Sequence, residues 1–127
     1  MKKKSFLVTG GSGFIGTNFC EIVSKKHKVL NIDKLTYCSV PEKYKINFNK
    51  NYKFNKVDLA QIRRVFKIMN KNKFDYLVNF ASETHVDRSI ENPRMFIKKN
   101  IDSNLLLIDI IRLLFVEKQL KKNFKFI

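Results

Sequence analysis

All four glycines of the chain lie in one seven-residue segment, a spacing that can bind phosphate. The segment reads Gly10-Gly11-Ser12-Gly13-Phe14-Ile15-Gly16 and separates an apolar run from a stretch of helical spacing. In such a turn one glycine makes a bend that side chains would obstruct, Gly13 lets the backbone approach a pyrophosphate, and Gly16 lets the helix pack closely. Backbone amides at the start of the helix then point at the phosphates.

An acidic residue follows this turn at the distance that a dinucleotide site requires. Asp33 ends the second apolar run, 17 residues after Gly16. A carboxylate there accepts hydrogen bonds from the adenosine ribose and repels a 2′-phosphate, so the pair predicts NAD over NADP, with Lys34 offsetting part of that repulsion. Asp58 ends the third apolar run; with Leu59 it could contact the adenine, or it could cap the next helix.

Strand-like and helix-like segments alternate around these residues. We expect strands at 5–8, 28–32, 52–57 and 74–80 and the opening of a fifth at 124–127. We expect helices from Phe14, over 60–70 and from Pro93, and a loop with room for one helical turn over 36–51. The inward faces are predicted to carry Ile15, Phe19, Ile22 and Val23 in the first helix and Phe96, Ile97, Ile101, Leu105 and Ile108 in the long one.

This alternation predicts an α/β fold with a doubly wound parallel sheet of the NAD-binding Rossmann type. Right-handed crossovers give the strand order 3-2-1-4-5, with the ligand crevice at the carboxyl ends of strands 1 and 4. The fifth strand only opens before the sequence stops, so the predicted fold is incomplete. Residues 1–127 are expected to form the N-terminal part of a dinucleotide-binding domain.

The formal net charge of +15 has a compositional explanation. Lys, Asn, Ile and Phe are abundant and have AT-rich codons, and the basic residues are spread along the chain, whereas a nucleic-acid groove concentrates them among stacking aromatics. We therefore expect no nucleic-acid partner. No apolar stretch reaches membrane-spanning length, and Cys20 and Cys38 have no metal or disulfide spacing. The sequence favours a cytoplasmic location without a membrane partner.

The motifs resemble a known group. Residues 9–16 look like the phosphate turn of the extended short-chain dehydrogenase/reductase superfamily, and residues 33–37 resemble the ribose segment of one member family. The stretch Glu83-Thr84-His85-Val86-Asp87-Arg88-Ser89-Ile90 closely resembles that of dTDP-glucose 4,6-dehydratases, which act in deoxysugar and cell-surface polysaccharide biosynthesis.

The resemblance implies a set of binding residues. Those on the cofactor side are Gly10, Gly13, Phe14, Ile15, Gly16, Asp33, Lys34, Leu35, Thr36, Asp58, Leu59, Phe80, Ala81, Ser82 and Glu83. Those on the side of the nucleotide-sugar substrate are Thr84, His85, Asp87 and Arg88. We expect the charged pair Asp87 and Arg88 to shape a loop rather than to act in catalysis.

The resemblance also implies a reaction. In the family, NAD⁺ takes a hydride from C4 of the glucosyl ring, water leaves across C5–C6, and the hydride returns to C6. The Tyr-x-x-x-Lys and Asp-Glu segments that the family uses for proton transfer are absent up to Ile127, as is the substrate domain. We therefore assign no catalytic residue and expect negligible turnover by this chain alone.

Other functions stay open from the sequence. The chain could be a non-catalytic dinucleotide-binding module, a fragment of another nucleotide-sugar epimerase or dehydratase, or a basic nucleic-acid binder. The resemblance allows a family-like homodimer through the long helix, although the missing covering elements disfavour it for this chain.

Overall fold

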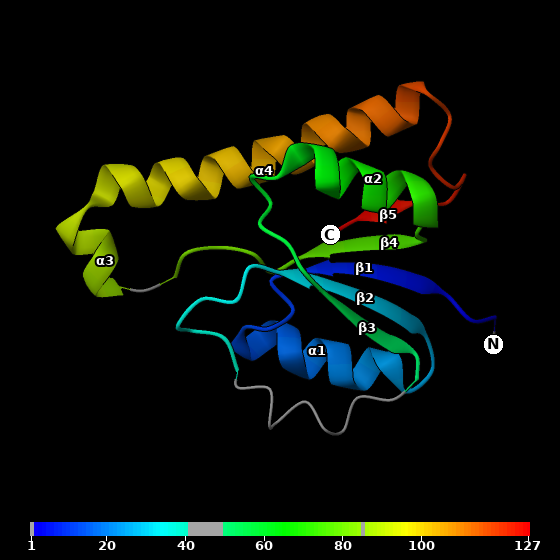
Figure 1. Ribbon diagram of the computed structural model, residues 1–127, viewed down its shortest axis with the longest axis horizontal. Coiled ribbons are helices and arrows are strands. Elements are labelled where there is room, and N and C mark those ends of the chain that lie inside the picture. The colour runs from blue at the N-terminus through cyan, green and yellow to red at the C-terminus, as the bar shows by residue number, and fades with distance from the viewer. Residues whose placement is uncertain (1, 41–49, 85) are drawn as a thin grey trace.

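The computed structural model is a parallel sheet with helices on both faces (Figure 1). It describes residues 2–40, 50–84 and 86–127, with Arg88 described by its backbone alone. The strands are β1 (Ser5–Thr9), β2 (Lys28–Asp33), β3 (Tyr52–Lys56), β4 (Tyr76–Asn79) and β5 (Lys125–Phe126). The helices are α1 (Phe14–Ser24), α2 (Ile62–Asn72), α3 (Val86–Glu91) and α4 (Pro93–Val116).

The strand order β3-β2-β1-β4-β5 confirms the predicted topology. All four strand pairs are parallel, with β1 at the centre between β2 and β4. The segments that follow the carboxyl ends of β1 to β4 therefore gather at one end of the sheet, on the left in Figure 1. That end is where a doubly wound fold binds its ligands.

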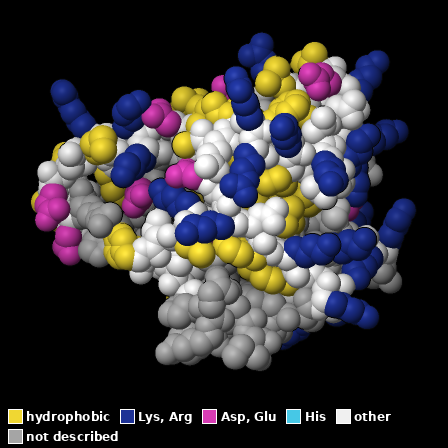
Figure 2. Space-filling view, in the orientation of Figure 1, with side chains coloured by type: hydrophobic (Ala, Val, Ile, Leu, Met, Phe, Trp, Pro, Cys, Tyr) yellow, Lys and Arg dark blue, Asp and Glu magenta, His cyan; other side chains and the backbone are white. Residues whose placement is uncertain are grey.

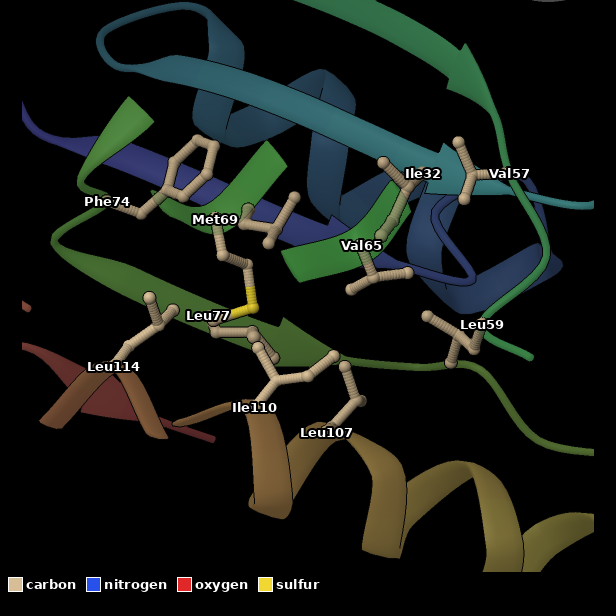
Figure 3. Packing of buried hydrophobic residues seen from close by; sticks show 11 residues of the cluster. Ile32, Val57, Leu59, Val65, Met69, Phe74, Leu77, Leu107, Ile110 and Leu114 are labelled. Carbon is tan, nitrogen blue, oxygen red and sulfur yellow. The ribbon is translucent and has the colours of Figure 1, made fainter. Parts of the chain in front are cut away.

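The larger core lies between the sheet and the helices α2 and α4. Figure 3 shows how Ile32 and Leu77 from the sheet meet Val65 and Met69 of α2. From α4 the side chains of Leu107, Ile110 and Leu114 complete this cluster, each at most 1% exposed. Burying an aliphatic side chain of this size contributes about 1.5–3 kcal/mol, so the cluster fixes α4 against the sheet.

The predicted inward face of the long helix is wrong. Ile97, Ile101, Leu105 and Ile108 are about half exposed, whereas Phe96 is partly buried. The long helix carries apolar residues on more than one side, so the spacing fits two faces, and contact with β4 and α2 selects the face of Leu107, Ile110 and Leu114.

The first helix is also rotated from its predicted orientation. Ile15 and Ile22 are exposed, Phe19 and Val23 are partly buried, and the fully covered positions are Gly16, Thr17, Cys20 and Ser24. The glycine turn brings α1 so close to the sheet that small residues face it. Cys20 packs there with Val8 of β1 and Val29 of β2 in a second, smaller core.

At the other end of the sheet, one carboxylate links the first residue of β1 to the segments that precede β4 and β5. Oδ2 of Asp75 accepts hydrogen bonds from the backbone N–H and the hydroxyl of Ser5, both at 2.8 Å, and from Nζ of Lys121 at 2.9 Å. Burial by itself would raise the pKa of Asp75, but these hydrogen bonds outweigh it and lower the pKa from 3.8 to about 2.

Lys and Arg side chains lie over several elements on the face seen in Figure 2, among apolar and neutral polar groups. Within the described ranges, no helix combines the length and the apolar character needed to cross a membrane.

We expect Asp75→Asn to lower the free energy of unfolding by roughly 1–2 kcal/mol, the range of a charge-assisted hydrogen bond in a partly exposed site. Because the native pKa lies below the unfolded value, this stabilisation is complete above about pH 4 and is lost as the pH falls through about 2. Urea unfolding at a series of pH values measures it.

Asp102→Asn is the matched control, because Asp102 pairs with Lys98 on the exposed surface of α4 at 2.8 Å. Its removal should barely move the urea midpoint at any pH. Equal losses from the two substitutions would contradict the role of Asp75.

Candidate functional site

A cleft of about 980 Å³ opens at the carboxyl end of the sheet. Its floor is the glycine turn, one wall comes from the ends of β2 and β3, and the other comes from residues after β4 and from α4. A volume of this size is at the upper end of small-molecule sites, so it can take an extended ligand.

Three glycines of the turn, Gly10, Gly11 and Gly16, leave no room for a side chain. Because they carry none, the turn can pack closely at the bottom of the cleft. Gly10 has φ of +69°, and a Cβ there would be 2.6 Å from the Cα of Ala81. A Cβ on Gly16 would strike the carbonyl oxygen of Gly10 and be 2.6 Å from the Cα of Gly11. The turn is therefore packed between the segment that follows β4 and its own helix.

Gly13 differs from these glycines. A Cβ on Gly13 would meet only the carbonyl oxygen of Gly10, at 3.4 Å. It is the N-cap of α1, where no side chain caps the amides of the first turn. The packing of the chain therefore does not require glycine here, whereas a ligand that lies on those amides would.

Asp33 lies against the glycine turn, as the sequence predicts. Its Oδ2 accepts a hydrogen bond from the backbone N–H of Ser12 at 3.1 Å, and its Oδ1 accepts one from Leu35 at 2.8 Å. The carboxylate keeps further acceptor positions toward the cleft, which it lines. The contact joins the turn at the floor of the cleft to the carboxylate at the end of β2.

Asn31 is a second residue that holds the turn, and it is not among the residues predicted from the sequence. The side chain is completely buried; its Oδ1 accepts from the N–H of Gly11 at 3.0 Å, and its Nδ2 donates to Ser12 Oγ at 3.1 Å and to Tyr52 at 2.9 Å. A polar amide inside the apolar run 29–32 was the available signal, because a buried amide needs partners.

The segment after β4 is held by three more asparagines. Asn100 of α4 accepts from the N–H of Glu83 at 2.7 Å and donates to its carbonyl at 3.0 Å. Asn79 accepts from the N–H of Ala81 at 3.1 Å and donates to Asn104 at 2.8 Å. The spacing of Asn100 and Asn104, one helical turn apart, was the signal for this second support.

Most of the predicted cofactor residues line the same cleft. They are Gly10, Gly13, Phe14, Ile15, Gly16, Asp33, Lys34, Thr36, Asp58, Leu59, Phe80, Ala81, Ser82 and Glu83. Leu35 does not line it; its φ of +59° and the hydrogen bond to Asp33 make it part of the bend that follows β2.

Asp58 has a structural contact as well as a place in the cleft. Its Oδ1 accepts from the N–H of Ala60 at 3.0 Å, which braces the turn before α2, although the N-cap of that helix is Gln61. Across the cleft, Lys34 Nζ and Glu83 Oε1 are 3.5 Å apart.

The predicted substrate residues are only partly brought together. Thr84 lines the cleft, Asp87 does not, and His85 lies outside the described residues. The prediction that Asp87 and Arg88 lie on a loop is wrong, because both belong to the short helix α3. Among the described residues, no cluster of three metal-ligating side chains occurs.

Comparisons with known proteins identify the family of the chain. Residues 7–127 match the family described as GDP-mannose 4,6 dehydratase, and the chain therefore belongs to that family. It is 40% identical to a dTDP-glucose 4,6-dehydratase of Xanthomonas campestris pv. campestris over 110 residues, covering 85% of this chain and 31% of that protein. A dTDP-glucose 4,6-dehydratase of Escherichia coli is 34% identical over 125 residues, covering 94% and 35%.

Solved structures give the same fold. A UDP-glucose-4-epimerase from Stenotrophomonas maltophila with bound NAD superposes with a TM-score of 0.75 at 25% identity, over 86% of this chain and 33% of that one. A dTDP-glucose 4,6-dehydratase double mutant from Streptomyces venezuelae with NAD bound gives 0.71 at 27% identity, over 87% and 35%. The chain thus spans about a third of the length of the relatives it matches.

We predict that Gly16→Ala and Gly13→Ala differ sharply in stability. The first should cost about 2–3 kcal/mol or prevent folding, because the added methyl overlaps backbone that cannot move away. The second should change the free energy of unfolding by less than about 1 kcal/mol, because its methyl has open space. Chemical denaturation followed by circular dichroism measures both, and equal losses would contradict the packing described here.

Proposed function

We propose that this chain is the NAD-holding part of a dTDP-glucose 4,6-dehydratase. The observation that carries the proposal is the hydrogen bond from the N–H of Ser12 to Asp33 at 3.1 Å, at the edge of the cleft. It supports one ligand that spans both features, with a diphosphate over the glycine turn and a ribose at the carboxylate. The dehydratase relatives at 34–40% identity support the choice of enzyme.

The residues fit NAD in a definite order. Amides at the start of α1 would hold the diphosphate beside Gly13, where a ligand can approach without meeting a side chain. Asp33 would accept from the adenosine ribose, and Asp58 and Leu59 would border the adenine. Ala81 and its neighbours would run past the nicotinamide ribose, where a small side chain permits close approach.

When bound, NAD would supply the hydride acceptor and donor for oxidation at C4 of the sugar and reduction at C6. This chain would fix the position of the cofactor through Asn31 and Asn100, which hold the two backbone segments on either side of it. Thr84, which lines the cleft, is proposed to contact the nucleotide sugar, and Asp87 and Arg88 on α3 are proposed to shape the substrate side of the site.

The sugar carrier is proposed to be dTDP. The matched family is described by GDP-mannose 4,6 dehydratase, whereas the curated relatives quoted above are dTDP-glucose 4,6-dehydratases. The segment 83–90 favours the dTDP-sugar enzymes, because GDP-mannose dehydratases usually lack its Asp-Arg-Ser part.

We expect Asp33→Asn to weaken NAD⁺ binding by about 10-fold or more, because a neutral amide replaces a charge-assisted acceptor. Titration calorimetry measures the affinity, and a thermal melt of each variant separates lost binding from lost folding. Asp109→Asn, an equal charge change at an exposed position of α4, is the control and should leave the affinity unchanged. Unchanged affinity in Asp33→Asn would refute the ribose contact.

We also expect no measurable turnover when the 127-residue chain is incubated with NAD⁺ and dTDP-glucose. In the family resemblance the proton-transfer residues lie outside this sequence, and general acid–base help is worth roughly 10²–10⁴ in rate per step. The absorbance of the keto sugar in alkali measures turnover, with a full-length family enzyme as the positive control. A clear signal from the chain alone would contradict this prediction.

A further inference from the structure

The ion pair between Lys34 and Glu83 crosses the cleft over the glycine turn. Lys34 follows β2, Glu83 follows β4, and both side chains line the cleft. Because β1 lies between β2 and β4 in the sheet (Figure 1), a contact between the segments after those two strands passes over the segment after β1, which is the glycine turn. The ammonium group of Lys34 is therefore held over the floor of the cleft, where the proposed function places a diphosphate.

This ion pair is weak. The Nζ of Lys34 and the Oε1 of Glu83 are 3.5 Å apart, whereas a well-formed ammonium–carboxylate hydrogen bond measures about 2.7–2.9 Å. The side chain of Lys34 is 44% exposed, so water competes for its ammonium group. An ion pair this exposed favours the joined arrangement by only about 1.5- to 5-fold. An anion that approaches Lys34 more closely can therefore replace Glu83 as its partner.

The backbone on each side of the pair is held independently of it. The N–H of Leu35, next to Lys34, donates to Oδ1 of Asp33 at 2.8 Å. Asn100 binds both the N–H and the carbonyl of Glu83, at 2.7 and 3.0 Å. A change of partner thus needs only the rotation of two long side chains, which is fast at exposed positions. Replacing the carboxylate of Glu83 should leave the segment after β4 in place.

The charges in the cleft give the ammonium group of Lys34 its importance. Although the whole chain is strongly basic, acidic side chains outnumber basic ones among the described residues that line the cleft. The acidic ones are Asp33, Asp58, Glu83 and Asp102, and the basic ones are Lys34 and Lys99. A diphosphate adds negative charge to this cleft, so Lys34 attracts it most strongly when it is released from Glu83.

We propose that the carboxylate of Glu83 competes with the diphosphate of the dinucleotide for the ammonium group of Lys34, so that Lys34 changes partner when the ligand binds. The proposal rests on the proposed NAD function, which places the diphosphate on the glycine turn. It gives the side chain of Glu83 a role opposite to that of a ligand contact. Removing the carboxylate should strengthen binding, whereas removing a ligand contact would weaken it.

Titration calorimetry with NAD⁺ on four chains tests this as a double-mutant cycle: wild type, Glu83→Gln, Lys34→Gln and the double variant. Glu83→Gln should tighten binding by about 1.5- to 5-fold, because the ion pair no longer has to be broken. Lys34→Gln should weaken it by about 2- to 5-fold, because no ammonium group meets the diphosphate. The double variant should bind like Lys34→Gln, because Glu83 acts through Lys34.

Lys98→Gln and Asp109→Asn are the matched controls. Each makes the same charge change as one of the single variants, at an exposed position of α4 that does not line the cleft. Both should leave the affinity for NAD⁺ unchanged, which separates the exchange at Lys34 from the general field of the chain. A thermal melt of each variant checks that it folds.

Unchanged or weaker NAD⁺ binding by Glu83→Gln would overturn the proposal while leaving the proposed function intact. An equal gain from Glu83→Gln in the Lys34→Gln background, or from Asp109→Asn, would overturn it as well. If no chain binds NAD⁺, the proposed function fails, and inorganic pyrophosphate decides the competition. Tighter binding of pyrophosphate by Glu83→Gln than by the wild type then supports it, and equal binding or none refutes it.

Discussion

The close approach of Gly10 to the backbone after β4 is the constraint on which the site depends. No side chain fits between Gly10 and Ala81, so the turn after the central strand lies directly against the segment that follows its neighbour. Two side chains of β2 then fix the turn from the other side: Asn31 holds the N–H of Gly11, and Asp33 holds that of Ser12. A turn held from both sides keeps its amides in place before a ligand arrives, which lowers the ordering cost of binding.

Asparagine side chains hold the backbone segments of the cleft in place. Asn31, Asn79 and Asn100 each bind backbone groups of a segment that lines the cleft. An amide side chain both donates and accepts, so one residue can fix an N–H and a carbonyl together, as Asn100 does with Glu83. The chain is rich in asparagine, and several of these residues position the backbone around the cleft.

The order of the strands and the pairing of the glycine turn with Asp33 were predictable from the sequence, because each rests on a local pattern with one physical solution. A run such as 5–8 stopped by glycine predicts a buried strand, and an acid after the next run predicts the ribose contact.

The helix faces were not predictable in this way. Leu105 and Leu107 are equally apolar, and only the position of β4 and α2 decides that Leu107 is buried and Leu105 exposed. The roles of Asn31 and Asn100 also depend on segments distant in sequence. The short helix α3 was missed because the segment around Asp87 reads as a charged loop.

The carboxylate of Asp75 has a consequence for the order in which the chain acquires its structure. It binds Ser5, which lies 70 positions before it in the sequence, and Lys121, which lies 46 positions after it. During synthesis β1 can pair with β2 soon after both leave the ribosome, but its other edge stays open until β4 follows. The contact between Asp75 and Lys121 can form only after residue 121 has also been made. Long-range pairing of this kind slows folding because the entropy of closing the loop must be overcome first. The central strand is therefore paired along one edge only until the ribosome has made β4.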